Sequence, residues 1–367
     1  MTLQEAIRDF CSRYGFEKTY WVAYSGGLDS HVLLAICHEL RQTEPLQLRA
    51  IHINHGIHPH AHQWAAHCAK VCVEMGIDYH ERAIQLELPP GTSLEEAARK
   101  QRYAILAEDL NEGDILLTAH HQDDQAETVL LQLFRGAGPK GLAAMPRMKP
   151  FGRGFHGRPL LDFPRATLEQ YAATHSFQWI EDDSNRDTSL TRNFIRHELL
   201  SLLKTRWPTV TQSISRSAAY CAEAQGLLEE WAKEEWQTVQ GSRDNTLSVS
   251  KLLALDVARQ RLFLRLWIQQ LGHPLPDAKK LDTIQYNVLT AKPDRQPCVR
   301  WQQTEIRRYR DDLYLMKALP PAAAISTRRG SHTLKRLFQE WGIPPWERNR
   351  LRNLLSPLEE GERKKKS

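Results

Sequence analysis

The sequence predicts an α/β protein: a parallel-sheet nucleotide-binding domain, then a mostly helical domain and a short C-terminal domain. Apolar strand-like runs alternate with helical patterns four times in the first half of the chain. Such alternation is typical of a parallel sheet with helices on both faces. Polar and glycine-containing motifs follow two of these runs, at the strand ends where such sheets bind ligands. The 367 residues suffice for two or three domains, and we expect boundaries at 1–210, 211–318 and 319–367.

The predicted elements follow from these periodicities. Strands are expected at 19–24, 46–54, 78–85 and 114–119, and helices at about 29–41, 64–75, 94–110 and 123–134. Glycine and proline predict a loop at 136–164, before an αβ-like piece at 165–179. Later patterns predict helices at 213–240 and 252–271, short strands within 293–317, and a linker at 319–326.

Composition favours a cytoplasmic protein with no membrane segment. No run of about 18 apolar residues occurs, and the first residues lack the features of a signal peptide. The net charge is +5, and arginines cluster beyond position 300, which favours contact with phosphate. The six cysteines form no CxxC pair, and Cys68 and Cys72, spaced i,i+4, are expected to be buried thiols.

The strongest motif is SGGLDS, which comprises Ser25, Gly26, Gly27, Leu28, Asp29 and Ser30 and directly follows the first strand. Glycines allow close approach of a ligand, and the start of the next helix offers free amides and a positive dipole end to phosphate. A carboxylate at Asp29 is unusual beside phosphate unless a cation lies between them, which suggests Mg²⁺. The alternative is a glycine turn with a side-chain helix cap. The GK[ST] ending of a Walker A loop is absent.

A second motif, TAHHQDDQAET, spans the end of the fourth strand and the start of the next helix. Here His120 precedes Asp124 and Glu127, which are spaced i,i+3 and share a helix face. The carboxylates suit Mg²⁺ binding or proton acceptance, although acids at a helix start are also favourable as structure.

Three further features are less specific. Arg135 opens a glycine-containing segment that is either a helix cap with an ordinary loop or a mobile basic segment near substrate. Arg192 and Arg196 share a helix face with Asn193 between them, which suits a phosphate or carboxylate, although spacing alone favours surface salt bridges. The histidines of residues 52–58 match no zinc pattern, and a loop near the nucleotide with an unusual backbone angle at Gly56 is expected instead.

SGGLDS resembles the PP-loop of ATP pyrophosphatases, which transfer AMP and release pyrophosphate. In order, SGGLDS, HINHGI, EEAARKQRY, TAHHQDDQAET, RGAGPKGL and DDSN…RNFIRHELL resemble the tRNA(Ile)-lysidine synthetase family over most of residues 15–210. Weaker resemblance to the family's middle and C-terminal domains follows. The family's carboxylates correspond to Asp29, Asp124 and Glu127, with His120 at the strand end and Arg99 as a weaker nucleotide or tRNA contact.

The resemblance implies an ATP-dependent ligase. Its substrate would be an isoleucine tRNA with a CAU anticodon, whose wobble cytidine is adenylated on the C2 oxygen. The side-chain amine of free L-lysine would then displace AMP to give lysidine. Residue spacing itself identifies neither lysine as the amine nor which carboxylate is the base. The oligomeric state is also open, with a dimer as one option.

The end of the chain departs from the family pattern. The link after Lys317 is short and the final residues lack the expected strands, so we expect an abbreviated C-terminal domain and an effect on tRNA discrimination. The alternatives are a PP-loop tRNA thiolase, disfavoured by the missing CxxC, a PP-loop synthetase for a small metabolite, and an inactive RNA-binding relative.

Overall fold

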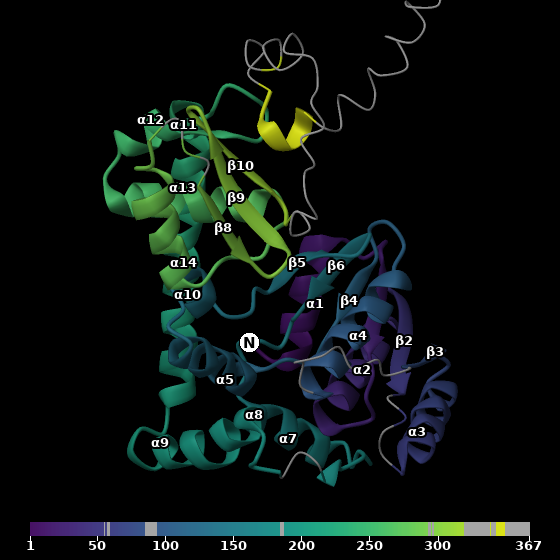
Figure 1. Ribbon diagram of the computed structural model, residues 1–367. Helices are drawn as coiled ribbons and strands as arrows, with labels where there is room; N and C mark the ends of the chain where they lie inside the picture. The colour runs from purple at the N-terminus through teal and green to yellow at the C-terminus, as the bar shows by residue number, and fades with distance from the viewer. Residues whose placement is uncertain are drawn as a thin grey trace, which may run out of the picture. The chain divides into compact units, whose positions relative to one another are not determined.

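A computed structural model of the chain describes residues 1–54, 56, 59–84, 94–183, 187–292, 295, 297–318, 338 and 343–348, with 94–96 as backbone only. The chain divides into two compact units, Met1–Gly226 and Leu227–Ser367. Each unit has its own sheet and its own buried apolar cluster. Figure 1 labels the elements of both units.

A six-stranded, mostly parallel sheet forms the centre of the first unit, as the sequence predicts. Its order is β3-β2-β1-β4-β6-β5. The strands are β1 (Thr19–Ala23), β2 (Gln47–Asn54), β3 (Asp78–Ala83), β4 (Ile115–Leu117), β5 (Met148–Phe151) and β6 (Gly154–Gly157). Strands β3, β2, β1, β4 and β6 pair in parallel, and β5 is antiparallel to β6. The carboxyl ends of the neighbouring strands β1, β4 and β6 therefore meet at one edge.

Helices cover both faces of this sheet because successive strand residues point to opposite sides. Tyr20 and Val22 of β1 belong to the main apolar cluster, whereas Trp21 packs with Leu106 and Leu110 on the other side. The helices that contribute to the main cluster are α1 (Leu3–Tyr14), α2 (Leu28–Leu40), α3 (Ala61–Glu74) and α7 (Arg165–Thr174). The opposite face is covered by α4 (Leu94–Glu108).

The prediction that residues 136–164 form a loop is wrong. This stretch contains the short helix α6 (Pro139–Leu142) and the hairpin of β5 and β6. Each strand has four residues, and β6 is held by parallel pairing with β4. Strands this short carry no periodic signal of their own, and their glycine and proline content predicts turns. The αβ-like piece at 165–179 proves to be the helix α7 without a following strand.

Further helices complete the first unit. They are α5 (Gln122–Phe134), which follows β4, and then α8 (Thr191–Phe194), η2 (Ile195–Leu199), α9 (Leu200–Arg206) and α10 (Val210–Glu234), whose last residues belong to the second unit. Ala126 and Leu130 of α5 pack against Ile195 and Leu200. This contact places η2 and α9 against the helix that bears the predicted carboxylates.

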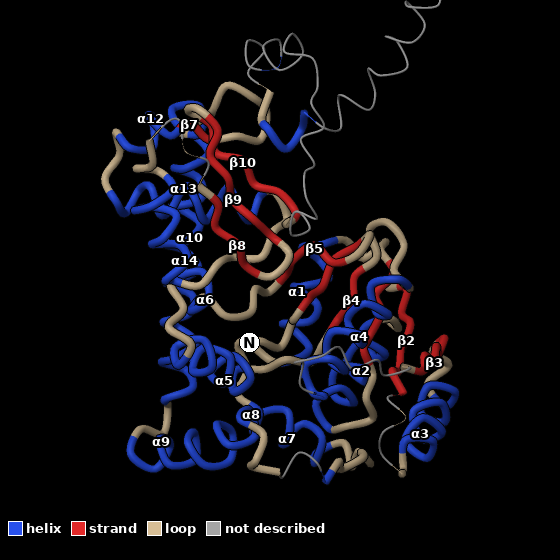
Figure 2. Tube along the Cα trace, in the orientation of Figure 1, coloured by secondary structure: helices blue, strands red, loops and turns tan. Residues whose placement is uncertain are grey.

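The second unit combines helices with an antiparallel sheet in the order β7-β10-β9-β8, drawn in red in Figure 2. Its elements are α11 (Trp236–Val239), β7 (Leu247–Ser248), α12 (Val249–Leu253), α13 (Val257–Gln270), α14 (Ala278–Thr283), η3 (Ile284–Val288), β8 (Cys298–Trp301), β9 (Thr304–Tyr309) and β10 (Asp312–Lys317). The short strands expected within 293–317 are confirmed, whereas the single helix expected at 213–240 ends at Glu234.

The predicted linker at 319–326 and nearly all of the predicted C-terminal domain lie outside the described residues. Within the described part of the chain, no helix has both the length and the apolar character needed to cross a bilayer.

Candidate functional site

The SGGLDS loop joins β1 to α2 with its helix amides left without a side-chain cap. Gly27 is the N-cap residue and makes no side-chain capping bond. The two serines bind within the loop instead: Ser25 Oγ lies 3.0 Å from Ser30 Oγ, which donates to the Gly27 carbonyl oxygen at 3.0 Å. The structure therefore contradicts the alternative in which a side chain of this motif caps the helix. The first turn of α2 therefore has free amides that suit an anion such as phosphate.

Gly26 holds the loop in a shape that other residues cannot adopt. Its φ of +83° lies in the left-handed region, and a Cβ there would come within 2.6 Å of Ile180 Cδ1 and 2.9 Å of Cys68 Sγ. The Gly26 carbonyl also accepts a hydrogen bond from the Ile180 amide at 2.9 Å. Cys68 and Cys72 are buried as predicted, and burial raises the pKa of each thiol to about 12.

Asp29 lies in the first turn of α2 and faces a histidine and an arginine. Its Oδ2 is 3.7 Å from His121 Nε2, and its Oδ1 is 3.7 Å from Arg165 Nε. Oδ1 is buried and accepts no hydrogen bond from the described residues. A carboxylate oxygen of this kind beside a phosphate site suits Mg²⁺, which prefers oxygen ligands and takes most of them from phosphates and water. The described residues contain no cluster of three or more metal-binding side chains.

The helix α5 begins at an N-cap histidine. The Asp124 amide donates to His121 Nδ1 at 3.4 Å, and the His121 amide donates to Asp124 Oδ2 at 3.0 Å. Burial alone would lower the pKa of His121, but the charges of Asp124, Asp29 and Asp123 outweigh it and raise the pKa above its usual value. This residue thus links the carboxylate of the phosphate loop to those of α5.

Asp124 and Glu127 lie against the two arginines predicted from spacing. Arg192 Nε donates to Glu127 Oε2 at 2.7 Å, and Arg196 Nε donates to Glu127 Oε1 at 2.5 Å. Both guanidinium groups also reach Asp124 Oδ1, at 3.2 and 2.8 Å. The structure thus brings four predicted site residues together. The expectation of surface salt bridges is corrected, because the Glu127 side chain is fully buried; burial and charge pairing were not visible in the i,i+4 spacing.

The ionisation of Asp124 follows from these neighbours. Burial would raise the pKa of its carboxyl group, but the positive charges of His121, His120, Arg192 and Arg196 hold that pKa well below its usual range. Asp124 is therefore an ionised group, suited to attracting a cation and weak as a proton acceptor.

The pKa of His120 shifts in the opposite direction to that of its neighbour His121. Its Nδ1 is 2.6 Å from Thr118 Oγ1, and Thr118 also contacts His156 Nε2 at 2.8 Å. Burial lowers the pKa of His120 to about 3, with Arg158 and Arg192 acting in the same direction against Asp124. At neutral pH His120 is an uncharged imidazole.

A cavity of about 570 Å³ adjoins the carboxylates. Its lining includes Glu127, Arg196, Asp123, Arg165 and Lys204. Lys204 Nζ donates to Asp123 Oδ1, and the Arg165 amide donates to Asp123 Oδ2 at 3.0 Å. The lining therefore presents charges of both signs, which suits a small ligand that also has both.

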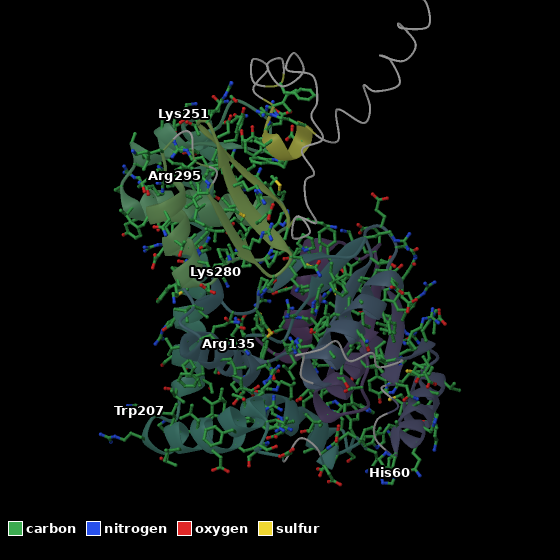
Figure 3. All side chains as sticks on the ribbon, in the orientation of Figure 1. His60, Arg135, Trp207, Lys251, Lys280 and Arg295 are labelled. Atoms are coloured by element: carbon green, nitrogen blue, oxygen red, sulfur yellow. The ribbon has the colours of Figure 1, made fainter. Side chains whose placement is uncertain are left out.

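The other predicted contacts lie in different settings. Arg99 is exposed on α4, its guanidinium carbon 5.3 Å from the centre of the Tyr103 ring. Arg135 is exposed at the end of α5 and is labelled in Figure 3. The Asn193 side-chain amide donates to the Asp187 carbonyl at 3.0 Å. Gly56 has the left-handed angle that was predicted, with φ of +63°.

One member of the basic group beyond residue 300 has a structural role. Arg308 is buried, and its Nη1 donates to the carbonyl oxygens of Leu289 and Ala291 at 2.6 Å each. Its side chain binds carbonyl groups just beyond the end of η3 and so stabilises this end of the helix. Its place in a basic cluster is therefore not evidence of phosphate binding.

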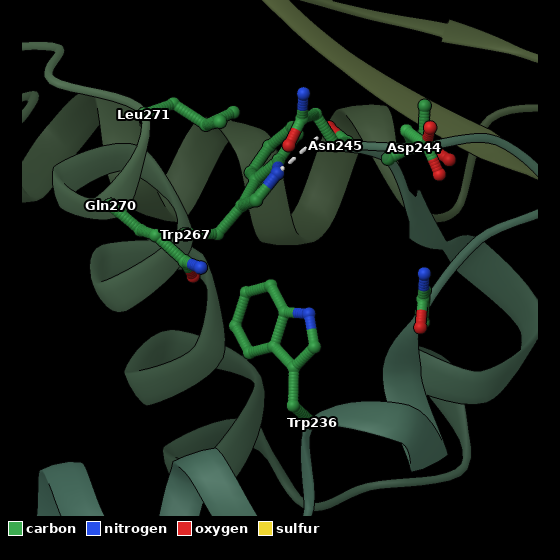
Figure 4. A pocket seen from close by; sticks show the side chains of 8 residues that line it. Trp236, Asp244, Asn245, Trp267, Gln270 and Leu271 are labelled. Carbon is green, nitrogen blue, oxygen red and sulfur yellow. Dashed lines mark hydrogen bonds between the residues drawn. The ribbon is translucent and has the colours of Figure 1, made fainter.

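The second unit has a separate cavity of about 300 Å³ between two indole rings. Figure 4 shows Trp236 and Trp267 there, with the Trp267 Nε1–H donating to the Asn245 carbonyl at 3.0 Å. Asp244 and Gln270 add polar groups to the lining. The indole rings and the nearby amide groups that line this cavity suit planar polar molecules.

Sequence reasoning missed several residues of the site in the first unit. His121 was treated as part of a motif without a role, and Arg165, Lys204, His156 and Arg158 were not singled out. The adjacency of His121 to His120 was the one available signal. The other four come from segments 30 to 80 residues away, and only the fold brings them to the end of β4.

The comparison with family profiles agrees with this geometry. The PP-loop domain profile matches residues 2–203, which contain the phosphate loop and the carboxylates. The chain therefore has an ATP-binding PP-loop domain. Profiles of the TilS substrate-binding domain and the TilS substrate C-terminal domain match residues 247–314 and 322–354.

Curated relatives make the assignment more specific. The tRNA(Ile)-lysidine synthase of Coxiella burnetii is 40% identical and covers 95% of this chain and 88% of its own. The enzymes of Methylococcus capsulatus and Legionella pneumophila are 41% and 38% identical, each over 90% of this chain. The chain belongs to the tRNA(Ile)-lysidine synthase family, a family of ATP-dependent ligases. A U34-tRNA thiolase structure from Methanococcus maripaludis, at 20% identity and a TM-score of 0.49 over 60% of this chain and 78% of its own, is too distant to support a functional inference.

Proposed function

We propose that this chain converts the wobble cytidine of an isoleucine tRNA with a CAU anticodon to lysidine, using ATP and free L-lysine. The observation that supports this most is the meeting of an uncapped phosphate loop with three carboxylates at the ends of two neighbouring strands. Asp29 belongs to the loop after β1, and Asp124 and Glu127 to the helix after β4. Membership of the family supports the choice of these substrates.

The first step is adenylation of the cytosine. The C2 oxygen attacks the α-phosphorus of ATP, a new P–O bond forms, and the bond to pyrophosphate breaks. Residues 25–30 would bind the phosphates through the helix amides and serine hydroxyls. Mg²⁺, held by Asp29 and the phosphates, would offset charge on the leaving pyrophosphate. His120, as a neutral imidazole, would donate a hydrogen bond to an oxygen that gains negative charge.

The second step replaces AMP with lysine. The ε-amine attacks C2, and the C2–O bond breaks, so that AMP leaves with the former C2 oxygen. The ammonium, with a reference pKa near 10.4, must first lose a proton. We assign Asp124 to attracting the ammonium group, because its low pKa makes it a weak base, and Glu127 to accepting the proton once substrate displaces Arg192 and Arg196. The cavity beside Glu127 is the proposed lysine site.

The remaining assignments concern the RNA. Arg99, Arg135 and Asn193 are proposed contacts to tRNA or substrate, and Arg192 and Arg196 are proposed to exchange carboxylate for substrate contacts. The proposed division is a catalytic domain over 1–210, a tRNA-contacting domain over 211–318 and a C-terminal domain over 319–367. Use of tRNA, ATP and free lysine places the proposed reaction in the cytoplasm.

The test is transfer of isotope-labelled lysine. The protein is incubated with ATP, Mg²⁺, labelled lysine and a tRNA(Ile) transcript with a CAU anticodon, beside an initiator tRNA and an Asp29→Ala variant. Digestion and mass spectrometry should find lysine only on the wobble cytidine of tRNA(Ile), and not with the variant. Label on both tRNAs would support the chemistry but contradict the specificity. No label on either, with folded protein, would contradict the proposed function and favour an inactive relative.

A further inference from the structure

An unbroken series of hydrogen bonds connects the end of β6 to the end of β4. Arg158 Nη2 lies 3.1 Å from His156 Nδ1, His156 Nε2 lies 2.8 Å from Thr118 Oγ1, and Thr118 Oγ1 lies 2.6 Å from His120 Nδ1. Arg158 and His156 are 3% and 0% exposed, and Thr118 is also buried. Only His120, at the far end of the series, is partly open.

The direction of these bonds follows from the chemistry of the first group. A guanidinium can only donate, so His156 Nδ1 must accept and carry no proton. A neutral imidazole then has its proton on Nε2, which donates to the Thr118 oxygen. The Thr118 hydroxyl has one proton, and it is directed to His120 Nδ1. That nitrogen accepts, and the His120 proton must be on Nε2.

The geometry points to a positioning role for Arg158, His156 and Thr118: together they fix His120 as the tautomer whose Nε2–H faces the reaction site. We call these three residues the tautomer chain. The assignment of the tautomer needs no assumption about the substrate, whereas its use in catalysis rests on the proposed function. Arg158, His156 and Thr118 touch no reacting atom in this scheme, and only His120 does.

The surroundings keep both histidines neutral, as the tautomer chain requires. Burial lowers the pKa of His156 far below its usual value, and Arg158, His120 and Lys149 act in the same direction. Among the described residues, the groups that act most strongly on the pKa values of Arg158 and Lys149 are Tyr103 and other arginines, and none is a carboxylate. A second proton on either ring would therefore meet positive charge on most sides, with Asp124 near His120 as the opposing group.

A fixed neutral donor has a specific use at this position. Adenylation moves negative charge onto oxygens of the α-phosphate and of pyrophosphate, and a preorganised N–H stabilises such charge without reorientation. A neutral imidazole keeps its proton because its deprotonation is difficult, so it donates without transferring. The tautomer with the proton on Nδ1 would instead present a lone pair to the same oxygens and repel them.

Thr118 offers a matched pair of variants that tests this. Thr118→Val keeps the shape but removes the hydroxyl, and Thr118→Ser keeps the hydroxyl. The alternative is that Arg158 only anchors the hairpin, through its Nη1 bond to the Pro146 carbonyl at 2.7 Å. Under that alternative, valine and serine would behave alike in catalysis.

Two readouts are needed. Proteins with ring-¹⁵N histidine are measured by NMR at neutral pH without substrates, and His120→Gln assigns the His120 signals. Single-turnover release of pyrophosphate with ATP and tRNA(Ile) then gives the adenylation rate, with melting temperatures for each variant.

Wild-type protein should show His120 protonated on Nε2 alone. Thr118→Val should lose this preference and lower the adenylation rate about 10- to 100-fold at saturating ATP with little change in KM, while Thr118→Ser recovers most of the rate. A His120 proton on Nδ1 in the wild type, or equal rates in folded valine and serine variants, would overturn the inference. Lysidine formation that fails although the NMR tautomer is as expected would contradict the proposed function alone.

Discussion

The pKa values of two adjacent histidines shift in opposite directions because of the neighbours that the fold gives them. Burial, with arginines acting in the same direction, lowers the pKa of His120 to about 3, whereas three aspartates raise the pKa of His121 against the effect of its burial. In the sequence both are simply histidines before a helix. Charge state is thus a property of the folded site and had to be read from contacts.

The carboxylate of Glu127 gives a prediction at the residue scale. Glu127→Gln should slow lysine transfer by about 10²-fold or more, because the proposed proton acceptor is lost. Adenylation, measured as pyrophosphate release without lysine, should fall much less. Labelled-lysine transfer and pyrophosphate release on one preparation measure the two steps.

Glu74→Gln is the matched control, since Glu74 forms an exposed i,i+4 ion pair with Lys70. We expect it to change neither step, as exposed pairs contribute little. An equal loss in both steps for Glu127→Gln would show that the residue supports the site as a whole and would contradict its assigned role.

Residue types and spacing predicted which side chains belong to the site. They predicted the contacts of those side chains less well. SGGLDS and the carboxylates at Asp124 and Glu127 were found because motif and strand end coincide. The partners of Arg192 and Arg196 were not found, because nothing in a local sequence shows which helix will pack on which. Arg158, which donates a hydrogen bond to His156, belongs to none of the recognised motifs.

At the scale of elements, regular helices and strands were predictable and short ones were not. Strand β1 and helix α2 match their predicted ranges within two residues. The hairpin of β5 and β6 was missed because each strand is stabilised by its neighbour rather than by its own pattern. That hairpin supplies His156 and Arg158, so the error in the fold also concealed part of the site.

Gly26 gives a prediction for the strand–helix junction. Gly26→Ala should weaken ATP binding by more than tenfold and destabilise the protein by roughly 2–4 kcal/mol, from the left-handed angle and the contacts with Ile180 and Cys68. Gly113→Ala isolates the angle, since Gly113 has the same φ of +83° with no atom within 4 Å of a Cβ.

The control variant should lose only about 1–2 kcal/mol and keep its affinity for ATP. Calorimetric titration with ATP and chemical unfolding measure both quantities. If Gly26→Ala bound ATP as well as Gly113→Ala does, the close packing around the loop would have no bearing on the nucleotide site.

At the scale of the whole molecule, the two units differ in how acid should affect them. Among the described residues, every histidine with a lowered pKa lies in the first unit, including the buried His31 and His156. The second unit has instead carboxylates with lowered pKa values, at Glu305 and Asp311, where neighbouring hydrogen bonds outweigh burial.

The sign follows from where each pKa lies. Below about 6.5 the unfolded chain protonates histidines that remain neutral when folded, so the first unit loses stability as the pH falls. His31 and His156 together should cost about 3 kcal/mol between pH 7.5 and 5.5, partly offset by His121. The carboxylates of the second unit contribute fully until about pH 4 and are lost below it.

Hydrogen exchange followed by mass spectrometry at pH 7.5 and 5.5, corrected for the intrinsic rates, resolves the two units. Peptides from α2, β4 and β6 should become less protected at pH 5.5, and peptides from β9 and β10 should not. Equal loss of protection in both units would contradict the role of the buried histidines.

The packing around Gly26 bears on how far the phosphate loop can be transplanted. Its shape depends on Cys68, in the helix after β2, and on the Ile180 amide, which follows α7 and lies more than 150 residues along the chain. A graft of β1, the loop and α2 onto another sheet would carry the complete motif without the parts that shape it. The six residues of the motif therefore form only part of the structural unit that determines the shape of the loop. The other residues of that unit are spread over the first 180 positions, and they belong to it because they contact the loop.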